Sequence, residues 1–555
     1  MINPHRRFNF ASALLCVCMF ASGACGIILE YIQASLASMI LGNSFEQWAT
    51  VIGLMLFWMG FGSLIQAQIS KKYLIYAFIW VEIGLALVGG FSPTLTYISY
   101  GYTAHYSLVL YFFVSFIGIM IGLEIPVIIR INNDFSKELS TNLGNILSAD
   151  YLGSLIGSLI FVFVLLRFTP ITEAAFLTAS ANFSLAFITF VYFSKKGLLK
   201  KSFTLPAIML ITFCAVCYGY VHNRQWNIKI EQPLYDDPII YSKSTQYQQI
   251  SITNYIPLNE VRLFLNGNLQ FSSVDEHRYH EPMVHPVMNL VPIKTKVLIL
   301  GGGDGCVLRE VLKYKEVEEI FLVDLDPEMT RLAKYHPVLK KINQNAFKDS
   351  RILAVPENGV ILGIEKKEYF ETNKKKSQSK KHVDVYIVNI DADKFLSRVS
   401  GFWDVIIVDL PDPSTPELTK LYTAQFYKKI KKHLSQHGMM VVQATSPYLA
   451  KDSFLCIGRT IESAKFSALP FHENVPSFGD WGWYIAWHSN IRTEKVMGKI
   501  DRLSIDVPTK FISPKVFRKE LIFGKDELIT KNKLINTILH PVLLNIYNHE
   551  SWLIE

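Results

Sequence analysis

Long apolar runs separated by short polar stretches dominate the first part of this 555-residue chain. The first run begins at Ala11, and the others lie at roughly 48–67, 74–95, 107–129, 150–166, 172–193 and 204–221. Each is close to the ~20 residues that an α-helix needs to cross a bilayer. The pattern predicts a multi-pass α-helical membrane domain of about seven helices over residues 1–222.

The pattern changes after this region. From Tyr235 to Ser272 apolar residues alternate with other residues, and Asn266-Gly267 is a dipeptide favoured in type I′ hairpin turns. We expect a small antiparallel β-sheet domain over residues 223–290. Strand and helix patterns alternate from Val297, which predicts an α/β Rossmann-like domain of the methyltransferase type over residues 291–500 and a C-terminal extension over 501–555.

A glycine-rich loop lies at the start of the predicted α/β domain. The apolar strand Val297–Leu300 leads into Gly301–Gly305, and the next apolar run ends at Asp324, an order typical of nucleotide binding. A βαβ unit without a ligand would share this pattern. Asp304 places a carboxylate in the loop, where it would repel a pyrophosphate. The loop therefore favours a cationic nucleoside such as decarboxylated S-adenosylmethionine, which carries an ammonium but no carboxylate.

Carboxylates follow four predicted strands of this domain. In chain order they are Asp304, Asp324, Asp391, Asp409 and Asp412. Because ligands of open α/β sheets bind beyond the carboxyl ends of the strands, we expect these acids to converge on a site for a polycationic ligand. A carboxylate there could deprotonate an amine, whose pKa in solution is about 10.4, before the amine attacks the carbon beside a sulfonium.

Seven short motifs follow one another between about Gln248 and Trp483. They are YQQI, LNGNLQ ending at Gln270, DEHRYHE at Asp275–Glu281, GGGDG at Gly301–Gly305, VDLD at Val323–Asp326, DLPDPSTP at Asp409–Pro416 and LYTAQFY at Leu421–Tyr427. With these motifs the region resembles spermidine synthase, the polyamine aminopropyltransferase family. The apolar part is similar to membrane-fused, multi-pass members of that family, including its SGACGIILEY and GLEIPVIIR stretches.

The resemblance implies an activity. The enzyme would transfer an aminopropyl group from the co-substrate decarboxylated S-adenosylmethionine to a diamine, with putrescine giving spermidine and methylthioadenosine. It would need no metal and no further cofactor. Soluble relatives usually associate, so a homo-oligomer is expected.

The same resemblance assigns roles to residues. Asp409 would be the general base, Asp412 would hold the acceptor amine, Asp304 would contact the aminopropyl ammonium, and Asp324 would bind the ribose. The remaining expected contacts are Asp391 and Ala392 at the adenine, Gln248 and Pro416 along the nucleoside, and Gln270, Tyr279 and His280 around the amine.

Two positions depart from the family pattern. Asp324 stands where many members have glutamate, and Phe478 stands where many soluble members have a tyrosine near the acceptor. Asp480 and Trp481 could compensate for the missing hydroxyl, or they could serve only loop packing. The acceptor therefore stays open among putrescine, agmatine, cadaverine and longer amines.

Charge and cysteine content narrow the possible partners. The net charge of +8 comes largely from basic residues in short runs beside apolar segments and in the tract Lys374–Lys381, without a nucleic-acid-binding motif. A lipid bilayer is therefore the expected partner, and no nucleic acid. Cys214 and Cys217 are expected to be buried as small packing residues in a membrane helix, so neither a disulfide nor a metal site is predicted.

Two other functions share parts of this pattern. A small-amine methyltransferase using S-adenosylmethionine has the same fold, although Asp304 and the spacing of Asp409 and Asp412 disfavour it. A polyamine transporter or sensor with a fused binding domain would use Glu30 and Glu124, which are ionisable residues inside predicted spans. Hydrogen bonding between helices explains these two glutamates equally well.

The side of the membrane is a separate question. Basic residues lie at Arg6 and Arg7, Lys71 and Lys72, Arg130 and Lys137, and Lys195–Lys201, in alternate loops if there are seven spans. Basic loops stay in the cytoplasm, which would leave everything after Val221 outside. Either one span is miscounted or the catalytic part faces out. Because the nucleoside is made in the cytosol, we expect the catalytic part on the cytoplasmic side of the cell (inner) membrane.

Overall fold

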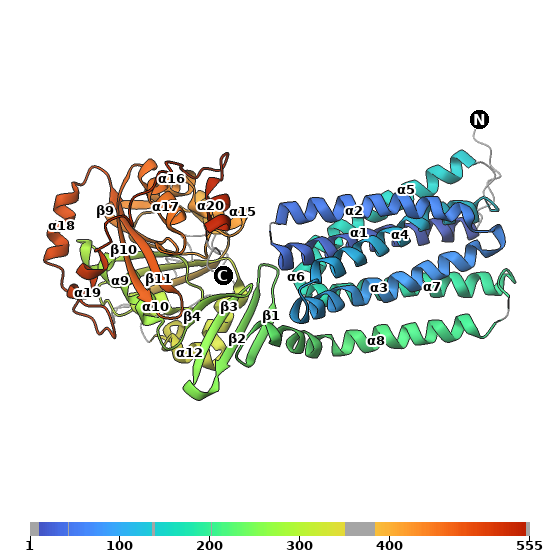
Figure 1. Ribbon diagram of the computed structural model, residues 1–555, viewed down its shortest axis with the longest axis horizontal. Coiled ribbons are helices and arrows are strands. Elements are labelled where there is room, and N and C mark those ends of the chain that lie inside the picture. Colours follow the sequence, from blue (N-terminus) through green and yellow to red (C-terminus); the bar gives the residue numbers. More distant parts are fainter. Residues whose placement is uncertain (1–9, 43, 136–138, 201, 350–382, 551–555) are drawn as a thin grey trace, which may run out of the picture. The chain divides into compact units, whose positions relative to one another are not determined.

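The computed structural model describes residues 10–42, 44–135, 139–200, 202–349 and 383–550. The tract Lys374–Lys381, together with Arg6, Arg7 and Lys137, lies outside these residues. The chain divides into two compact units, Met1–Gln246 and Tyr247–Glu555. The first is helical, and the second is built around β-sheets (Figure 1).

The first unit is a bundle of long helices. They are α1 (Phe10–Leu41), α2 (Ser44–Ile65), α3 (Leu74–Tyr102), α4 (Tyr106–Asn132), α5 (Leu139–Ile160), α7 (Ile171–Lys195) and α8 (Thr204–Glu231), with the short α6 (Leu166–Phe168) after a single π-helical segment. Within the described residues, seven helical stretches are long and apolar enough to cross a membrane, so the predicted number is confirmed. The last of these helices continues past the predicted boundary at residue 222.

Small residues let the helices of the bundle approach closely. A Cβ atom placed on Gly153 of α5 would lie 1.9 Å from the backbone oxygen of Phe20 on α1. One placed on Gly122 of α4 would lie 2.1 Å from the backbone oxygen of Met59 on α2. Only glycine fits at such backbone contacts, which are typical of helix packing without a strong hydrophobic driving force.

Two prolines interrupt the helices without leaving carbonyl groups unpaired. Pro126 has no N–H to donate to the carbonyl of Gly122, and the hydroxyl of Ser63 donates to that carbonyl at 2.9 Å. Pro93 likewise frees the carbonyl of Gly89, which accepts a 3.2 Å hydrogen bond from a neighbouring serine hydroxyl. Such replacement donors make proline tolerable inside a helix.

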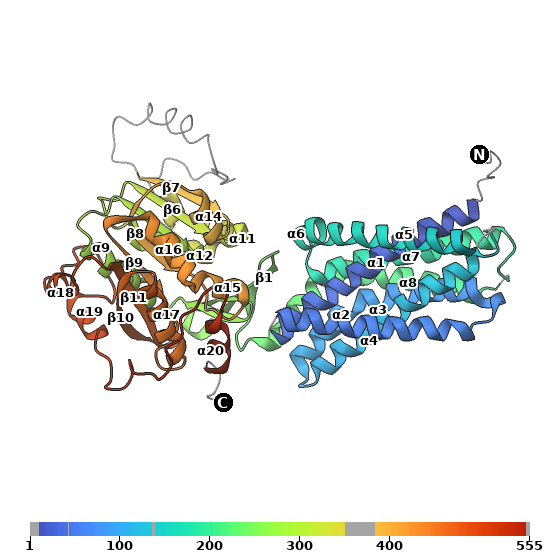
Figure 2. The same ribbon diagram turned by 90° about the horizontal axis from the view of Figure 1, so that it is seen from above.

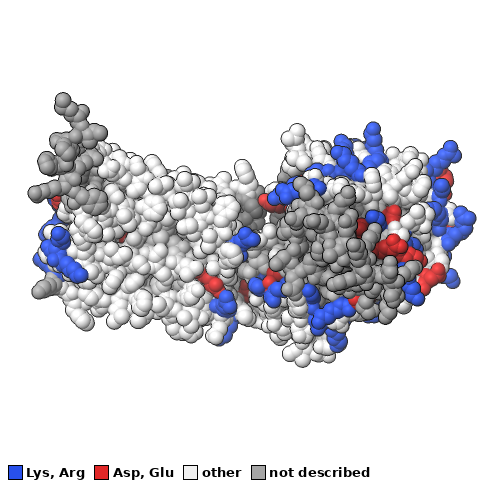
Figure 3. Space-filling model, turned by 180° about the vertical axis from the view of Figure 1, so that it is seen from behind, with Lys and Arg blue, Asp and Glu red and all other residues white. Residues whose placement is uncertain are grey.

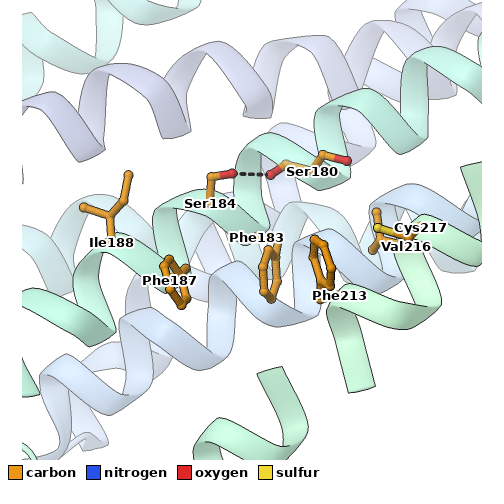
Figure 4. A pocket seen from close by; sticks show the side chains of 8 residues that line it. All are labelled: Ser180, Phe183, Ser184, Phe187, Ile188, Phe213, Val216 and Cys217. Atoms are coloured by element: carbon orange, nitrogen blue, oxygen red, sulfur yellow. Dashed lines mark hydrogen bonds between the residues drawn. The ribbon is translucent and has the colours of Figure 1, made fainter. Parts of the chain in front are cut away.

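The exposure of two cysteines corrects the sequence prediction. Cys214 and Cys217 are exposed on α8, although burial was expected. The buried positions of this helix follow a stripe through Thr212, Val216 and Gly219, and the cysteines lie beside that stripe. A hollow of about 340 Å³ opens here between α7 and α8 (Figure 4). It is lined mainly by apolar side chains such as Phe183, Phe187 and Phe213, and it contains no predicted site residue.

The second unit begins with a small antiparallel sheet. After β1 (Ile239–Ser244) at the end of the first unit, β2 (Gln249–Tyr255), β3 (Glu260–Leu265) and β4 (Asn268–Ser272) pair in sequence order. Asn266 and Gly267 join β3 to β4 with positive φ angles of 51° and 81°. This is the geometry of a type I′ turn, so the predicted hairpin is confirmed. The helix α9 (His277–Leu290) follows the sheet.

A seven-stranded sheet with the order β10-β11-β9-β8-β5-β6-β7 forms the rest of the unit. The strands β5 (Lys296–Gly301), β6 (Glu319–Asp324), β7 (Asp384–Asn389), β8 (Trp403–Asp409) and β9 (Leu434–Gln443) are parallel. The strand β11 (Gly479–His488) runs antiparallel to both of its neighbours, β9 and β10 (Phe466–Val475). The predicted Rossmann-like fold is confirmed.

Helices cover both faces of this sheet. Alternate residues of each strand point to opposite faces, so Val297 and Ile299 pack with α9 and α10 (Cys306–Val311), whereas Leu298 and Leu300 pack on the other side. That other face is covered by α14 (Ala392–Arg398), α16 (Ala424–His433) and α17 (Lys451–Ser463) (Figure 2). Strands covered on both faces read as continuous apolar runs, as the sequence showed.

The remaining helices belong to the same unit. They are α11 (Pro327–Tyr335), α12 (Pro337–Ile342), α15 (Pro416–Thr419), α18 (Thr493–Asp501), α19 (Pro514–Glu520) and α20 (Val542–Glu550). Phe517 and Leu543, from the predicted extension 501–555, are fully buried in the two core clusters of the sheet. Residues between 501 and 550 therefore complete the core of the α/β unit.

Candidate active site

The glycine loop brings two of the predicted carboxylates together. Gly302 donates its N–H to the backbone oxygen of Asp409 at 3.2 Å, and Gly303 donates to Oδ2 of Asp324 at 3.0 Å. A Cβ atom on Gly303 would lie 2.5 Å from that same Oδ2, so a side chain here would displace the carboxylate. Burial raises the pKa of Asp324 to about 7, although backbone amides donate to its carboxylate.

Asp409 lies at the end of β8 and is held from α9. The hydroxyl of Tyr279 donates to its Oδ1 at 2.8 Å. Burial raises the pKa of Asp409 to about 6, with a further increase from the charge of Asp304, while the charge of His280 and the hydrogen bond from Tyr279 act in the opposite direction. The carboxyl group is therefore mostly ionised at neutral pH, and it has both a negatively and a positively charged neighbour.

His280 is a buried cation beside these acids. Burial alone would lower its pKa, but the carboxylate of Glu276, 2.9 Å from Nδ1, raises it to about 9. Arg309 binds the same glutamate with its two terminal nitrogens at 2.7 and 2.9 Å. Glu276 thus keeps His280 charged, and the charge of His280 interacts with both Asp304 and Asp409.

Three residues of this network have the spacing of metal ligands. One donor atom each from Glu276, His280 and Cys306 lie within 4.8 Å of one another, and all three side chains are buried. Arg309 already binds both carboxylate oxygens of Glu276, at 2.7 and 2.9 Å, and Nδ1 of His280 lies 2.9 Å from one of them. The donor set therefore fits an ion-paired network and does not fit a metal site.

Asp412 lies beyond Asp409 on the same loop and accepts three hydrogen bonds from neutral donors. Tyr547 donates to its Oδ2 at 2.8 Å, Thr445 to the same oxygen at 3.2 Å, and Gln443 to Oδ1 at 3.2 Å. Burial nevertheless raises the pKa of Asp412. Tyr279 interacts electrostatically with both Asp409 and Asp412.

Three aromatic side chains pack around the ring of Tyr279. Its ring centroid lies 5.4 Å from that of Trp483, 5.8 Å from that of Phe478 and 6.5 Å from that of Trp481. Asp480, one of the two residues considered as replacements for the missing tyrosine hydroxyl, is 2.7 Å from Nδ1 of His472. Phe478 thus presents only apolar surface here.

The other predicted residues lie at neighbouring strand ends and loops. Asp391 caps α14 through the amide of Lys394 and pairs with Lys420 at 3.0 Å; burial would raise its pKa, but these bonds lower it overall. Ala392 is the first residue of α14, and Pro416 the first of α15. Gln248 donates to Oδ2 of Asp326 at 3.1 Å.

The residues expected to bind substrate are not all in contact with one another. Asp304, Asp324 and Asp409 are linked through the glycine loop and their mutual charges, and Asp412 joins them beside Tyr279. Gln270 instead donates to the carbonyl oxygen of Asn268 at 3.1 Å, its own neighbour on β4. Among the described residues, no hydrogen bond links Gln270 to the four acids.

Three residues of this site were not identified from the sequence. Glu276 and Arg309 carried a signal, because Glu276 belongs to the motif DEHRYHE and Arg309 is a charged residue inside the apolar pattern after the glycine loop. Tyr547 carried none, since it stands 135 residues after its partner Asp412 in a segment without a motif.

The chain is similar to several known proteins. Residues 276–497 match the spermine/spermidine synthase domain. A polyamine aminopropyltransferase of Oceanobacillus iheyensis is 36% identical over 540 residues, 95% of each chain. One of Leptospira interrogans is 37% identical over 475 residues, covering 85% of this chain and 87% of the relative. The crystal structure of spermidine synthase from Thermotoga maritima aligns with 52% of this chain and 87% of its own, with 25% identity and a TM-score of 0.41. Because the similarity to the Oceanobacillus iheyensis enzyme extends over nearly all of both proteins, the chain belongs to the polyamine aminopropyltransferase family.

Proposed function

We propose that the protein transfers the aminopropyl group of decarboxylated S-adenosylmethionine to a diamine, with putrescine as the acceptor and spermidine and methylthioadenosine as products. The observation that carries this proposal is the position of Asp409: its carboxylate binds the hydroxyl of Tyr279, which also interacts electrostatically with Asp412, and it interacts electrostatically with Asp304. Donor and acceptor are both cations, and a cluster of carboxylates at strand ends can hold two cations near each other.

Asp409 is the general base in this proposal. Its carboxylate takes a proton from the acceptor ammonium, and the nitrogen lone pair then attacks the aminopropyl carbon next to the sulfonium. An N–C bond forms while the C–S bond breaks, and its electron pair stays on sulfur as the neutral thioether methylthioadenosine. A pKa of about 6 suits this role, because Asp409 is ionised at neutral pH and can still accept a proton.

The donor is bound along the strand ends from β5 to β8. Asp304 contacts its ammonium, and Asp324 accepts hydrogen bonds from its ribose. Asp324 is oriented for this by the amides of Gly303 and Asp326, at 3.0 and 2.9 Å. The remaining proposed nucleoside contacts are Gln248, Asp391, Ala392 and Pro416.

The acceptor lies between Asp409 and Asp412. Asp412 binds the ammonium, while Gln270, Tyr279 and His280 frame the amine. The charge of His280 would repel an ammonium directly, so its contribution is to lower the pKa of Asp409. Tyr279 fixes the orientation of the base through its 2.8 Å hydrogen bond.

Product analysis tests the proposal. The purified full chain is incubated with putrescine and either decarboxylated or ordinary S-adenosylmethionine, and spermidine, methylthioadenosine and methylated amines are measured by mass spectrometry. Asp409→Asn should reduce transfer by about a hundredfold or more while donor binding persists. The exposed Asp501→Asn serves as the matched control. Methyl transfer from the ordinary donor alone would establish the methyltransferase alternative.

We further propose that the helical unit spans the cell (inner) membrane and that the catalytic unit faces the cytoplasm. On the face in Figure 3 the flank of the helical unit is almost free of charged side chains, which gather on the second unit and at the end of the bundle. With seven spans, a cytoplasmic catalytic unit would put the basic loops on the outer side of the membrane. This arrangement would go against the rule that basic loops stay in the cytoplasm. A green fluorescent protein fused to the C-terminus should fluoresce, because it folds in the cytoplasm; a silent fusion would place the unit outside.

A second candidate function, transport or sensing of polyamines, is favoured by one feature of the bundle. Glu82 of α3 is fully buried near the hydroxyl of Ser22, and among the described residues neither of its carboxylate oxygens accepts a hydrogen bond of ordinary geometry. It interacts electrostatically with Glu124 of α4, which accepts a hydrogen bond from Ser22. Among the described residues, no lysine or arginine pairs with either glutamate. Buried, unpaired acids in a span commonly bind cations or protons.

Vesicles containing the protein distinguish the two functions. Polyamine uptake that persists in Asp409→Asn and is lost in Glu82→Gln would establish transport as an activity separate from transfer. Transfer without uptake in the unaltered protein would leave the glutamates a structural role.

A further inference from the structure

The C-terminal helix α20 is fixed firmly on the catalytic unit. Glu550 accepts hydrogen bonds at 3.0 Å from the amides of Asp452 and Ser453, the first-turn donors of α17 that have no partner within their own helix. Leu543, at the other end of α20, is fully buried in the core cluster of the sheet. The helix is therefore held at both ends.

Tyr547 points from this fixed helix to Asp412. The residue is 8% exposed, and its hydroxyl donates to Oδ2 of Asp412 at 2.8 Å. Tyr547 and Glu550 are three residues apart and lie on one side of the helix, so the anchor on α17 also sets the position of the tyrosine ring. Residue 547 lies beyond the segment 276–497 that matches the synthase domain.

The hydrogen bond matters for the charge of Asp412. Burial favours the neutral form of this carboxyl group, and only hydrogen bonds from neutral donors oppose that effect. Tyr547 makes the shortest of them, at 2.8 Å against 3.2 Å for Thr445 and Gln443. Phe478, whose ring centroid lies 5.8 Å from that of Tyr279, has no hydroxyl to contribute.

We propose that Tyr547 is a positioning residue of the acceptor site, which holds the carboxylate of Asp412 ionised and correctly oriented for an ammonium group. The C-terminal helix is then part of the substrate-binding machinery. This inference rests on the proposed role of Asp412 in binding the acceptor amine. Tyr547 acts through Asp412 and does not take part in the chemical step.

Steady-state kinetics of Tyr547→Phe in the full chain test this inference. The phenylalanine keeps the ring packing and removes only the hydroxyl. We expect the KM for the acceptor to rise about tenfold, the loss typical of a hydrogen bond to a charged group, while the KM for the donor changes less than about twofold. The acidic limb of kcat/KM for the acceptor should move to higher pH, because Asp412 loses a donor to its charged form. Tyr448→Phe, at a residue that is 72% exposed, is the matched control.

Two results would overturn the inference. One is an unchanged acceptor KM in Tyr547→Phe. The other is an equal loss with both substrates together with a lower melting temperature, which would show a purely structural role. Asp412→Asn separates the inference from the proposed function: if it also leaves the acceptor KM unchanged, the role of Asp412 itself is wrong. If Asp412→Asn raises that KM and Tyr547→Phe does not, only the role of Tyr547 fails.

Discussion

The hydroxyl of Tyr279 donates a 2.8 Å hydrogen bond to Oδ1 of Asp409, although the two residues are 130 positions apart in the chain. One comes from the first turns of α9 and the other from the end of β8, so the bond exists only in the assembled α/β unit. The hydrogen bond restrains Asp409, the proposed base. Burial raises the pKa of Asp409 to about 6, and the hydrogen bond opposes that increase.

Removing this bond should change the pH dependence of transfer. The unaltered enzyme should lose kcat/KM as the pH falls through about 6, where Asp409 takes up a proton. In Tyr279→Phe the pKa of Asp409 rises, so the acidic limb should move to higher pH and the loss of activity should be larger at pH 6 than at pH 8. Initial rates across this range give the result, and superimposable profiles would contradict it.

Glycine at position 303 should be required for donor binding. Alanine would place a methyl group 2.5 Å from Oδ2 of Asp324 and push away the carboxylate proposed to bind the ribose. We expect Gly303→Ala to raise the donor KM about tenfold or more, with a smaller effect on the acceptor KM. Gly498→Ala, where the nearest atom is 3.9 Å away, is the control and should leave both constants unchanged. Equal donor KM values for the two variants would refute the assignment of Asp324.

Arg309 should stabilise the fold through its two buried glutamates. Its side chain is 5% exposed and pairs with Glu276 and Glu310 at 2.7 Å each. Arg309→Met leaves both carboxylates without this partner and should cost about 3 kcal/mol, seen as a drop of several degrees in the melting temperature. Arg331→Met removes an exposed pair with Glu328 and should cost less than about 1 kcal/mol.

The Arg309 effect should depend on pH in a defined direction. The pKa of Glu276 is lowered in the folded protein, where the bonds from His280 and Arg309 outweigh its burial. Its contribution to stability is therefore complete above the unfolded value of about 4.3 and is lost as the pH falls below it toward the folded value. The gap between the melting temperatures of the unaltered protein and Arg309→Met should narrow as the pH falls from 7 to 3. A constant gap would show that the arginine stabilises by packing alone.

The crossing of α1 and α5 should tolerate nothing larger than glycine at position 153. A Cβ atom there would lie 1.9 Å from the backbone oxygen of Phe20, and backbone cannot move aside as a side chain can. We expect Gly153→Ala to destabilise the helical unit by about 1–3 kcal/mol and to reduce the yield of monodisperse protein in detergent. Gly144→Ala lies in the same helix with no atom within 4 Å, and it should behave like the unaltered protein.

Short sequence patterns predicted helices and turns correctly where one local property, such as apolar length or a preference for positive φ, was sufficient. Seven apolar runs gave seven long helices, and the preference of Asn266-Gly267 for positive φ gave the hairpin between β3 and β4. Glu82 carried an equally clear signal, an ionisable residue inside an apolar run, but it was not selected. The exposure of Cys214 could not be predicted, because composition does not tell which side of an apolar helix meets a neighbour.

The sequence by itself determined the number and type of the elements, the placement of acids at the ends of the parallel strands, and the family to which the motifs belong. Only the tertiary structure decided which charges meet: Arg309 with Glu276, Tyr279 with Asp409, and Tyr547 with Asp412. The reason is that turns and apolar periodicity act over a few residues, whereas the charge and orientation of a buried carboxylate depend on donors brought from distant parts of the chain.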